Sequence, residues 1–136
     1  MMISTRGRYA LRVMIDLAEH KTDGYIPMKE VAARQEISLK YLERILPVLV
    51  KNGLVERVQG KGGYKLSRFP EECTVGEILR LTEGNLAPVA CLDCNDEVCE
   101  KKDTCKTLSM WTEFHRLTNR YFDDITIAEL ANGKSL

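Results

Sequence analysis

Apolar and polar positions in residues 1–70 are arranged as three helices followed by a β-hairpin. Apolar residues recur at helical spacing from Arg8 to Glu19, which predicts a first helix. The stretch "MKEVAARQ" (28–35) predicts a short second helix, and "LKYLERILPVLVKNG" (39–53) predicts a third with Ser38 as its N-cap. Pro47 lies inside the third stretch and predicts a kink or a break in that helix.

Residues 54–58 and 64–67 alternate apolar and polar side chains over short runs, which is typical of strands. The sequence "GKGG" (60–63) between them suits a flexible hairpin tip. Three helices and a hairpin, in this order, are the elements of a winged helix-turn-helix, in which the third helix enters the major groove of DNA and the hairpin is the wing. We therefore expect a mainly α fold with a small β-hairpin wing.

Capping signals mark two further helices in the second half of the chain. Thr74 and Glu77 predict a capping box for a helix that ends at Gly84. Thr126 and Glu129 predict a second capping box, which opens a final helical turn.

A long helix is expected between these two, from about Thr107 to Phe122. One face of it carries Trp111, Phe114, Leu117, Thr118 and Tyr121. Such a stripe fits either a core face or a dimer seam, because little chain remains to cover it. We predict a DNA-binding domain over residues 1–70 and a region with a cysteine loop and a dimerisation helix over residues 71–136.

The charge is divided unevenly between these regions. Residues 1–70 carry 13 Lys and Arg against 7 Asp and Glu, whereas residues 71–136 carry 7 against 13. This asymmetry favours a polyanion as partner of the first region, and the fold makes double-stranded DNA the expected one. Scattered solvated charge is the plainer alternative.

Several other classes of protein are disfavoured. No apolar run approaches the roughly 20 residues of a membrane span, and the N-terminus lacks a secretory cleavage pattern, so we expect a cytoplasmic protein that does not contact membranes. The chain has no evident nucleophile–base pair or paired carboxylates, and "GKGG" lacks the Lys-Ser/Thr ending of a phosphate-binding loop. We expect neither enzymatic activity nor a small-molecule substrate.

Four of the five cysteines lie within one polar stretch, "VACLDCNDEVCEKKDTC", at the spacing C-x2-C-x4-C-x5-C. In the reducing cytoplasm, clustered cysteines more often hold metal or undergo redox chemistry than form structural disulfides. The spacing is a poor match to a zinc ribbon, which places two C-x2-C pairs a dozen or more residues apart. An iron–sulfur cluster, zinc and a switch made of free thiols all remain open from the residues alone.

The chain resembles a family of bacterial winged-helix transcription regulators that includes IscR, NsrR and CymR, the Rrf-two family. The resemblance spans nearly the whole chain in order, and it is carried by "ISTRGRYALRVMIDLA" (3–18), "ISLKYLERILPVLVKNGLV" (37–55), "GGYKL" (62–66), "VGEILRLTEG" (75–84) and "ITIAELA" (125–131). It implies a homodimer joined through the long helix. It also implies an iron–sulfur cluster, 2Fe–2S or 4Fe–4S, because most members hold one with three cysteines from the loop before that helix.

By position, the resemblance assigns the cluster ligands to Cys91, Cys99 and Cys105. The expected DNA contacts on the third helix are Ser38, Lys40, Tyr41 and Glu43. Lys40 and Tyr41 suit phosphates, and Glu43 can accept a hydrogen bond from a cytosine amino group. On the hairpin, Arg57 and Lys61 are expected to meet phosphates.

The sequence departs from the family pattern at three positions. Gln59 stands where cluster-binding members commonly have a wing arginine, which weakens the case for minor-groove readout. Leu108 and Arg8 stand where two members have a histidine and an aspartate as fourth cluster ligand, so Cys94 becomes the candidate for that role.

These observations predict a homodimeric transcription regulator whose DNA affinity depends on an iron–sulfur cluster. The alternative is a regulator of the same family without a cluster, using zinc or a thiol switch, and controlled by redox state or by a protein partner. One family member works in this way with an enzyme of cysteine synthesis, and it lacks the cysteine set.

Overall fold

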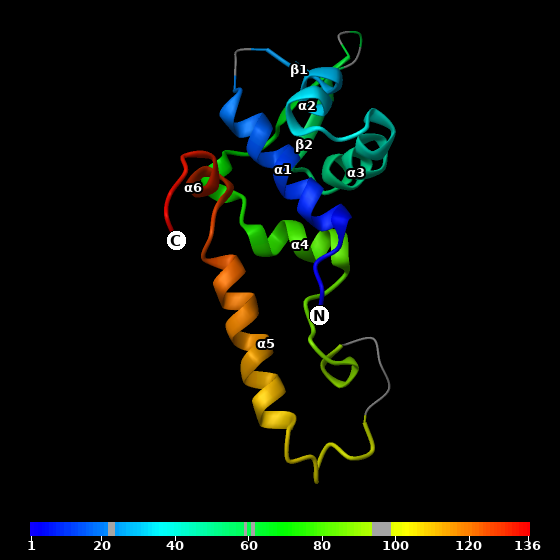
Figure 1. The fold of residues 1–136 in the computed structure, drawn as a ribbon, viewed down its shortest axis with the longest axis vertical. Coiled ribbons are helices and arrows are strands. Elements are labelled where there is room, and N and C mark those ends of the chain that lie inside the picture. Colours follow the sequence, from blue (N-terminus) through cyan, green and yellow to red (C-terminus); the bar gives the residue numbers. More distant parts are fainter. Residues whose placement is uncertain (22–23, 59, 61, 94–98) are drawn as a thin grey trace.

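The N-terminal part of the protein is a winged helix. The computed structural model describes residues 1–21, 24–58, 60, 62–93 and 99–136. Its first elements are α1 (Thr5–Glu19), β1 (Ile26–Pro27), α2 (Met28–Gln35), α3 (Leu39–Lys51), β2 (Val55–Val58) and β3 (Gly63–Leu66). Figure 1 shows α1 beside the α2–α3 pair, with the strands at the same end of the molecule. The fold class predicted from the sequence is confirmed.

The sheet has three antiparallel strands in the order β1-β3-β2. In the hairpin, Glu56 lies opposite Lys65, and their side chains form an ion pair of 2.9 Å. β1 joins through Ile26, which lies opposite Tyr64. Gly63 permits this pairing, because a Cβ there would lie 2.5 Å from the Cβ of Tyr25.

Serine side chains start both long helices of the winged helix. The Ser38 hydroxyl accepts a hydrogen bond of 3.1 Å from the backbone N–H of Tyr41, as the N-cap prediction requires. Ser4 caps α1 in the same way at Gly7, so α1 begins three residues before the predicted start at Arg8.

The α3 helix runs without interruption through Pro47, so the predicted helix break is wrong. Gly53 then ends it with a positive φ of 71°, and the N–H of Leu54 reaches back to the carbonyl of Leu49 at 3.0 Å. This pair of features is a Schellman motif, which satisfies the last carbonyls of the helix.

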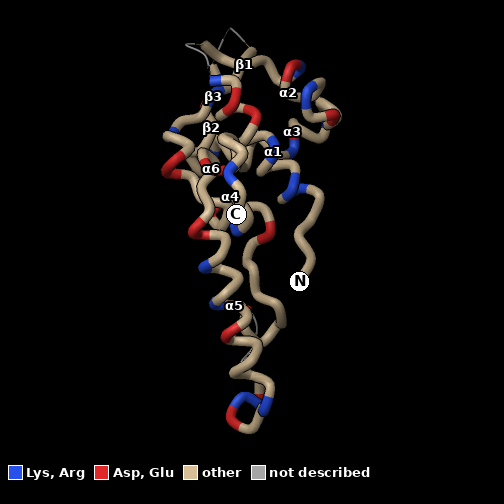
Figure 2. Tube along the Cα trace, turned by 60° about the vertical axis from the view of Figure 1, so that its left-hand side comes forward, with Lys and Arg blue, Asp and Glu red and all other residues tan. Residues whose placement is uncertain are grey.

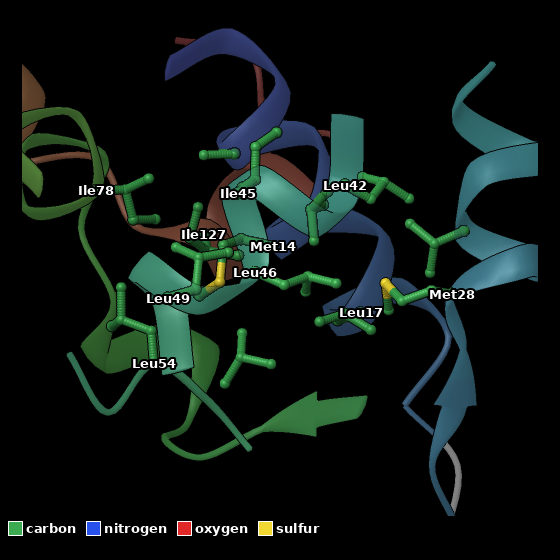
Figure 3. Close-up of a cluster of buried hydrophobic side chains, with 14 of the residues drawn as sticks. Met14, Leu17, Met28, Leu42, Ile45, Leu46, Leu49, Leu54, Ile78 and Ile127 are labelled. Atoms are coloured by element: carbon green, nitrogen blue, oxygen red, sulfur yellow. The ribbon is translucent and has the colours of Figure 1, made fainter. Parts of the chain in front are cut away.

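The hydrophobic core lies where α1 crosses α3, and Figure 3 shows its principal side chains. Met14 of α1 and Leu42, Ile45 and Leu49 of α3 are fully buried. Ile78 and Ile127 complete the same cluster from α4 (Val75–Glu83) and α6 (Ile127–Ala131). The packed core therefore continues past residue 70, and the proposed domain division at that position stays a prediction.

The two predicted capping boxes have different outcomes. Thr126 and Glu129 form the complete box, with both hydrogen bonds present. Thr74 accepts a hydrogen bond from the Glu77 N–H, but the Glu77 carboxylate accepts one from Arg68 at 2.7 Å instead of returning to the cap. The predicted box at Thr74 is therefore only half formed, because the carboxylate has a cationic partner.

The long helix α5 (Leu108–Asp123) extends away from the winged helix, and residues 99–107 of the cysteine loop lie at its far end (Figure 1). It contains no buried residue. Polar contacts attach it to α4 and to the segment after it: Arg80 binds Asp123 and Asn119, and a ring nitrogen of His115 lies 3.2 Å from the Leu86 carbonyl oxygen. Two 3-10 turns, Pro70–Glu72 and Ala90–Leu92, flank α4 in the chain. Within the described ranges, no helix is long and apolar enough to cross a membrane.

Candidate nucleic-acid interface and cysteine loop

The α2–α3 pair forms the helix-turn-helix. Glu36 ends α2 in the left-handed conformation with a φ of 53°, and it is the one described non-glycine residue with a positive φ. The next N–H, of Ile37, bonds to the Ala32 carbonyl at 3.1 Å and closes the turn. Backbone strain at a non-glycine residue is retained where surrounding structure requires the turn, here by the buried Ile37 side chain.

The exposed face of α3 carries the residues predicted to contact DNA. Ser38, Lys40 and Glu43 are exposed, and Tyr41 is half-buried. The Tyr41 ring meets the Tyr9 ring edge to face, with centroids 5.2 Å apart. The opposite face of α3 is the core face, so Ser38, Lys40 and Glu43 face solvent while Tyr41 lies at the edge of the core.

A groove of about 390 Å³ separates α3 from the wing. Glu43 of α3 and Arg57 of β2 both line it, together with Lys29 and Tyr64. The structure therefore brings together two predicted site residues that lie on different elements. Lys61, the other predicted wing contact, and Gln59 lie outside the described residues.

Some arginines of the winged helix have no partner among the described residues. Seven of the ten arginines form a hydrogen bond or an ion pair within the described part of the chain. The other three, Arg6, Arg44 and Arg57, have no such contact to a described residue and belong to α1, α3 and β2. Figure 2 shows the basic positions along these elements. Arg6, Tyr41 and Arg44 also line a hollow of about 380 Å³.

A buried carboxylate supports this face from within. Asp16 of α1 is 0% exposed and accepts hydrogen bonds from Arg34 at 2.7 and 3.0 Å and from Gln35 at 2.9 Å. Burial acts to raise the pKa of Asp16, but the hydrogen bonds and the charge of Arg34 outweigh it, so that the pKa lies below its usual value. The pair fastens α2 to α1. Sequence reasoning missed it, because Asp16 reads as an ordinary polar position of an amphipathic helix.

The three predicted cluster ligands are exposed, unpaired thiols. Cys91 lies in the turn after α4, while Cys99 and Cys105 precede α5. The Cys105 sulfur lies 3.4 Å from the Thr107 hydroxyl, and hydrogen bonding from Thr107 lowers the pKa of Cys105. Cys94, the candidate fourth ligand, lies outside the described residues.

Thiolates are suitable donors for an iron–sulfur cluster, so the residue types fit. Their positions do not form a ready-made site: among the described residues, no three His, Cys, Asp or Glu side chains are grouped as metal ligands would be. Cys73 differs from the three loop cysteines, because it is fully buried and burial raises the pKa of its thiol.

The residues of the predicted apolar stripe on α5 differ in their exposure. Phe114, Leu117 and Tyr121 are 44%, 50% and 56% exposed, whereas Trp111 and Thr118 are half-buried, and the Trp111 ring still meets the Phe114 ring edge to face. Met110, which the sequence interpretation left out, is 53% exposed. With it the exposed apolar residues recur at intervals of four, three and four, the pattern of a helix–helix seam.

A family described as "Rrf2: Iron-dependent Transcriptional regulator" matches residues 3–133. The chain belongs to the Rrf2 (Rrf-two) family. Among curated members, the HTH-type transcriptional regulators IscR of Yersinia enterocolitica and of Serratia proteamaculans are each 34% identical over 137 residues, covering 100% of this chain and 82% of the relative. The resemblance inferred from the sequence motifs is thereby confirmed, and this Rrf2 protein is a transcription regulator rather than a member of an enzyme class.

Solved structures of Rrf2 proteins agree with the fold described above. The oxidised form of Staphylococcus aureus CymR is 33% identical with a TM-score of 0.77, covering 100% of this chain and 98% of that one. The IscR of T. potens is 33% identical with a TM-score of 0.74, covering 99% and 89%. A regulator from Listeria innocua is 29% identical with a TM-score of 0.79, covering 100% and 90%. The fold is thus similar both to an IscR and to a CymR.

Proposed function

We propose that this Rrf2 protein binds operator DNA as a homodimer and that an iron–sulfur cluster in its cysteine loop modulates its DNA affinity. The observation that carries the proposal is the coincidence of two features at α3. Its exposed face adjoins the groove to the wing, which Arg57 lines, while Arg6 and Arg44 line a second hollow with Tyr41 of the same helix. None of these three arginines has a partner among the described residues. An unpaired guanidinium is suited to phosphate, which it binds with two parallel hydrogen bonds.

In this assignment the residues of α3 take two roles. Ser38, Lys40 and Tyr41 contact the DNA backbone, while Glu43 reads base edges in the major groove. Arg57, and Lys61 outside the described residues, extend the contact to the flanking backbone. A backbone contact positions the protein without reading sequence, so Glu43 is the residue on which base preference depends most.

The second chain of the dimer covers α5. Met110, Phe114, Leu117 and Tyr121 are exposed on one face of that helix. Four large apolar side chains at seam spacing on one helix make a self-complementary surface, the kind that joins two copies about a two-fold axis. Paired winged helices would then meet paired DNA half-sites.

The cluster is assigned to Cys91, Cys99 and Cys105, with Cys94 as the candidate fourth ligand. The description of the family as iron-dependent and the similarity to IscR support this assignment. The reducing cytoplasm, the proposed location, keeps such thiols available for a metal. Binding the cluster would draw together cysteines from both ends of the loop, and the thiols of Cys91, Cys99 and Cys105 are exposed and so accessible to a metal.

Purification without oxygen tests the cluster. We expect coloured protein with iron and acid-labile sulfide, whose optical and paramagnetic spectra distinguish a 2Fe–2S from a 4Fe–4S centre. Cys91→Ser, Cys99→Ser and Cys105→Ser should each lose iron, whereas Cys73→Ser, a change at a buried thiol, should retain it. Colourless protein without iron or sulfide, even after reconstitution, would exclude the cluster.

A second candidate is a cluster-free regulator that responds through zinc, through its thiols or through a protein partner. It is favoured by the similarity to CymR in its oxidised form. The same metal analysis separates the candidates. Zinc without iron, or DNA binding that depends on an oxidant in metal-free protein, would select the second one.

A further inference from the structure

A basic hollow on α1 and α3 contains two arginines to which no individual DNA contact has been assigned so far. It is lined by Arg6, Tyr41 and Arg44 and has a volume of about 380 Å³. Both arginines are exposed, and neither forms a hydrogen bond or an ion pair within the described residues. Two free guanidinium groups that face one hollow repel each other unless an anion lies between them.

We propose that this hollow binds one phosphate of the DNA backbone in each half-site, and that Glu83 is its positioning residue. The proposal rests on the DNA-binding function proposed above and extends the DNA contact from α3 to α1. Arg6 and Arg44 supply the charge, and the Tyr41 hydroxyl donates a hydrogen bond to the same phosphate.

The floor of the hollow is held rigidly. The Tyr41 ring packs against Tyr9, and the guanidinium of Arg12 lies over the other ring of the pair, Tyr9, at 5.2 Å. Arg12 in turn donates to the side chain of Gln35 at 3.1 Å, and Gln35 donates to the buried Asp16. Tyr41 is therefore positioned before DNA arrives, so less conformational freedom is lost on binding.

The start of α1, which carries Arg6, is fastened to the end of α4. One oxygen of the Glu83 carboxylate accepts hydrogen bonds from the Ser4 hydroxyl at 2.6 Å and from the Ser4 N–H at 3.1 Å. Gly7 allows this approach, because a Cβ there would overlap the Glu83 carboxylate. Glu83 is the last residue of α4, so the hollow depends on the segment that leads into the cysteine loop.

Salt dependence of DNA affinity measures the proposed contact directly. Each neutralised phosphate contributes about 0.9 to the slope of log K against log salt concentration. We expect Arg6→Ala and Arg44→Ala each to lower the slope by up to about 0.9 per half-site and to weaken binding about tenfold, on operator and on unrelated duplex alike. Because both arginines serve one phosphate, the double variant should lose little more than either single variant.

Arg116→Ala is the matched control, since Arg116 is an exposed arginine of α5 that pairs with Glu113. A slope equal to that of the control for both Arg6→Ala and Arg44→Ala overturns the proposal, as does a loss confined to operator DNA. If instead the unaltered protein fails to bind duplex DNA, the proposed function itself is wrong, so the two failures are distinguishable.

The role of Glu83 can be tested, because an electrostatic effect and a positioning effect predict opposite changes in DNA affinity when Glu83 is replaced. Removing a negative charge near DNA strengthens binding if charge alone matters. We expect Glu83→Ala to weaken DNA binding about threefold to tenfold and to lower the salt slope, because the start of α1, which carries Arg6, is no longer held by Glu83. Glu83→Gln should restore both values, since its amide oxygen still accepts hydrogen bonds from Ser4.

Glu77→Ala is the control here, because it removes the same charge from the same helix at a side chain that contacts Arg68. Ser4→Ala, which removes the hydroxyl hydrogen bond to Glu83 but keeps that of the Ser4 N–H, should weaken binding in the same direction as Glu83→Ala and by less. Tighter binding by both Glu83 variants, or equal affinities for Glu83→Ala and Glu77→Ala, would refute the positioning role.

Discussion

Replacing Asp16 by Asn tests whether the buried ion pair holds the helix-turn-helix to the rest of the fold. The change preserves the shape of the side chain and removes its charge. Arg34 then loses the anion to which it donates hydrogen bonds at 2.7 and 3.0 Å. We expect a clear loss of stability, because the guanidinium keeps only the exposed Glu30 carboxylate, 3.5 Å away, as an anionic partner.

The geometry limits the size of this loss. Breaking a fully buried ion pair costs about 3–5 kcal/mol. Here the Asp16 side chain is 0% exposed but that of Arg34 is 30% exposed, so water can reach the guanidinium after the change. We therefore expect a decrease in the free energy of unfolding of about 2–3 kcal/mol, which is less than for a fully buried pair. This corresponds to a midpoint lowered by roughly 8–12 °C at about 4 °C per kcal/mol.

Thermal and urea unfolding, at one fixed protein concentration, measure the difference. Glu113→Gln is the control, because it makes the same chemical change in an exposed pair with Arg116, where about 0–1 kcal/mol is expected. Adding Arg34→Met to Asp16→Asn should recover much of the loss, since no unpaired charge then remains. A loss for Asp16→Asn no larger than that of the control would refute the reasoning.

The pH dependence of stability follows from the same pair. The pKa of Asp16 is lower in the folded protein than in the unfolded chain, so its contribution is complete above the unfolded value of about 3.9 and is lost as the pH falls through the folded value. Asp16→Asn should therefore flatten the acid limb of the stability profile below about pH 4. If the decrease in stability at low pH is the same in Asp16→Asn, that decrease arises from other carboxylates and not from Asp16.

Three further outcomes are expected. Leu117→Arg places a charge in the exposed apolar face of α5 and should yield monomers in light scattering. A dimer that persists would show that this face of α5 is not the dimer interface. In metal-free protein at neutral pH, a maleimide should modify Cys91 rapidly and Cys73 only after unfolding, because Cys73 is buried and its pKa is raised. Leu42→Ala at a 0% exposed position should cost about 2–5 kcal/mol in urea unfolding, and a loss below 1 kcal/mol would contradict its place in the core.

The features of the fold that sequence reasoning predicted well are local ones. The α2 helix has the predicted bounds, and Ser38 caps α3, because apolar spacing and capping depend on residues within one or two turns. β1 was missed, since a two-residue strand has no period and exists only through its pairing with β3. The half-formed box at Thr74 was mispredicted for a similar reason, because Arg68 reaches Glu77 through the packing of the chain.

In the candidate site, too, the features that depend on local sequence were predicted and those that depend on packing were not. The residues of α3 were identified from the helix-turn-helix order and from the family resemblance, and their DNA contacts remain predictions. The hollow of Arg6, Tyr41 and Arg44 was not foreseen, since it depends on how α1 packs across α3. The basic run "TRGR" at the start of α1 was the available signal, but a run of charge does not reveal which arginines lack partners.

The position of α4 shows how a change in the cysteine loop would reach DNA under the proposed function. Two residues of α4 contact other helices. Glu83, its last residue, binds Ser4 at the start of α1, and Arg80 binds Asp123 and Asn119 of α5. The loop joins these two helices, so drawing its cysteines together would act on α4 and α5 at once. A shift of α4 would move the start of α1, which carries Arg6. A shift of α5 would turn the winged helix of one chain relative to that of the other chain of the dimer. Half-sites are read about 34 Å apart, so a small rotation at the dimer helix would become a large displacement at the recognition helices. Glu83→Ala releases the first of these connections and leaves the second intact, so its effect on DNA affinity would separate local loss of a phosphate contact from rotation of the dimer.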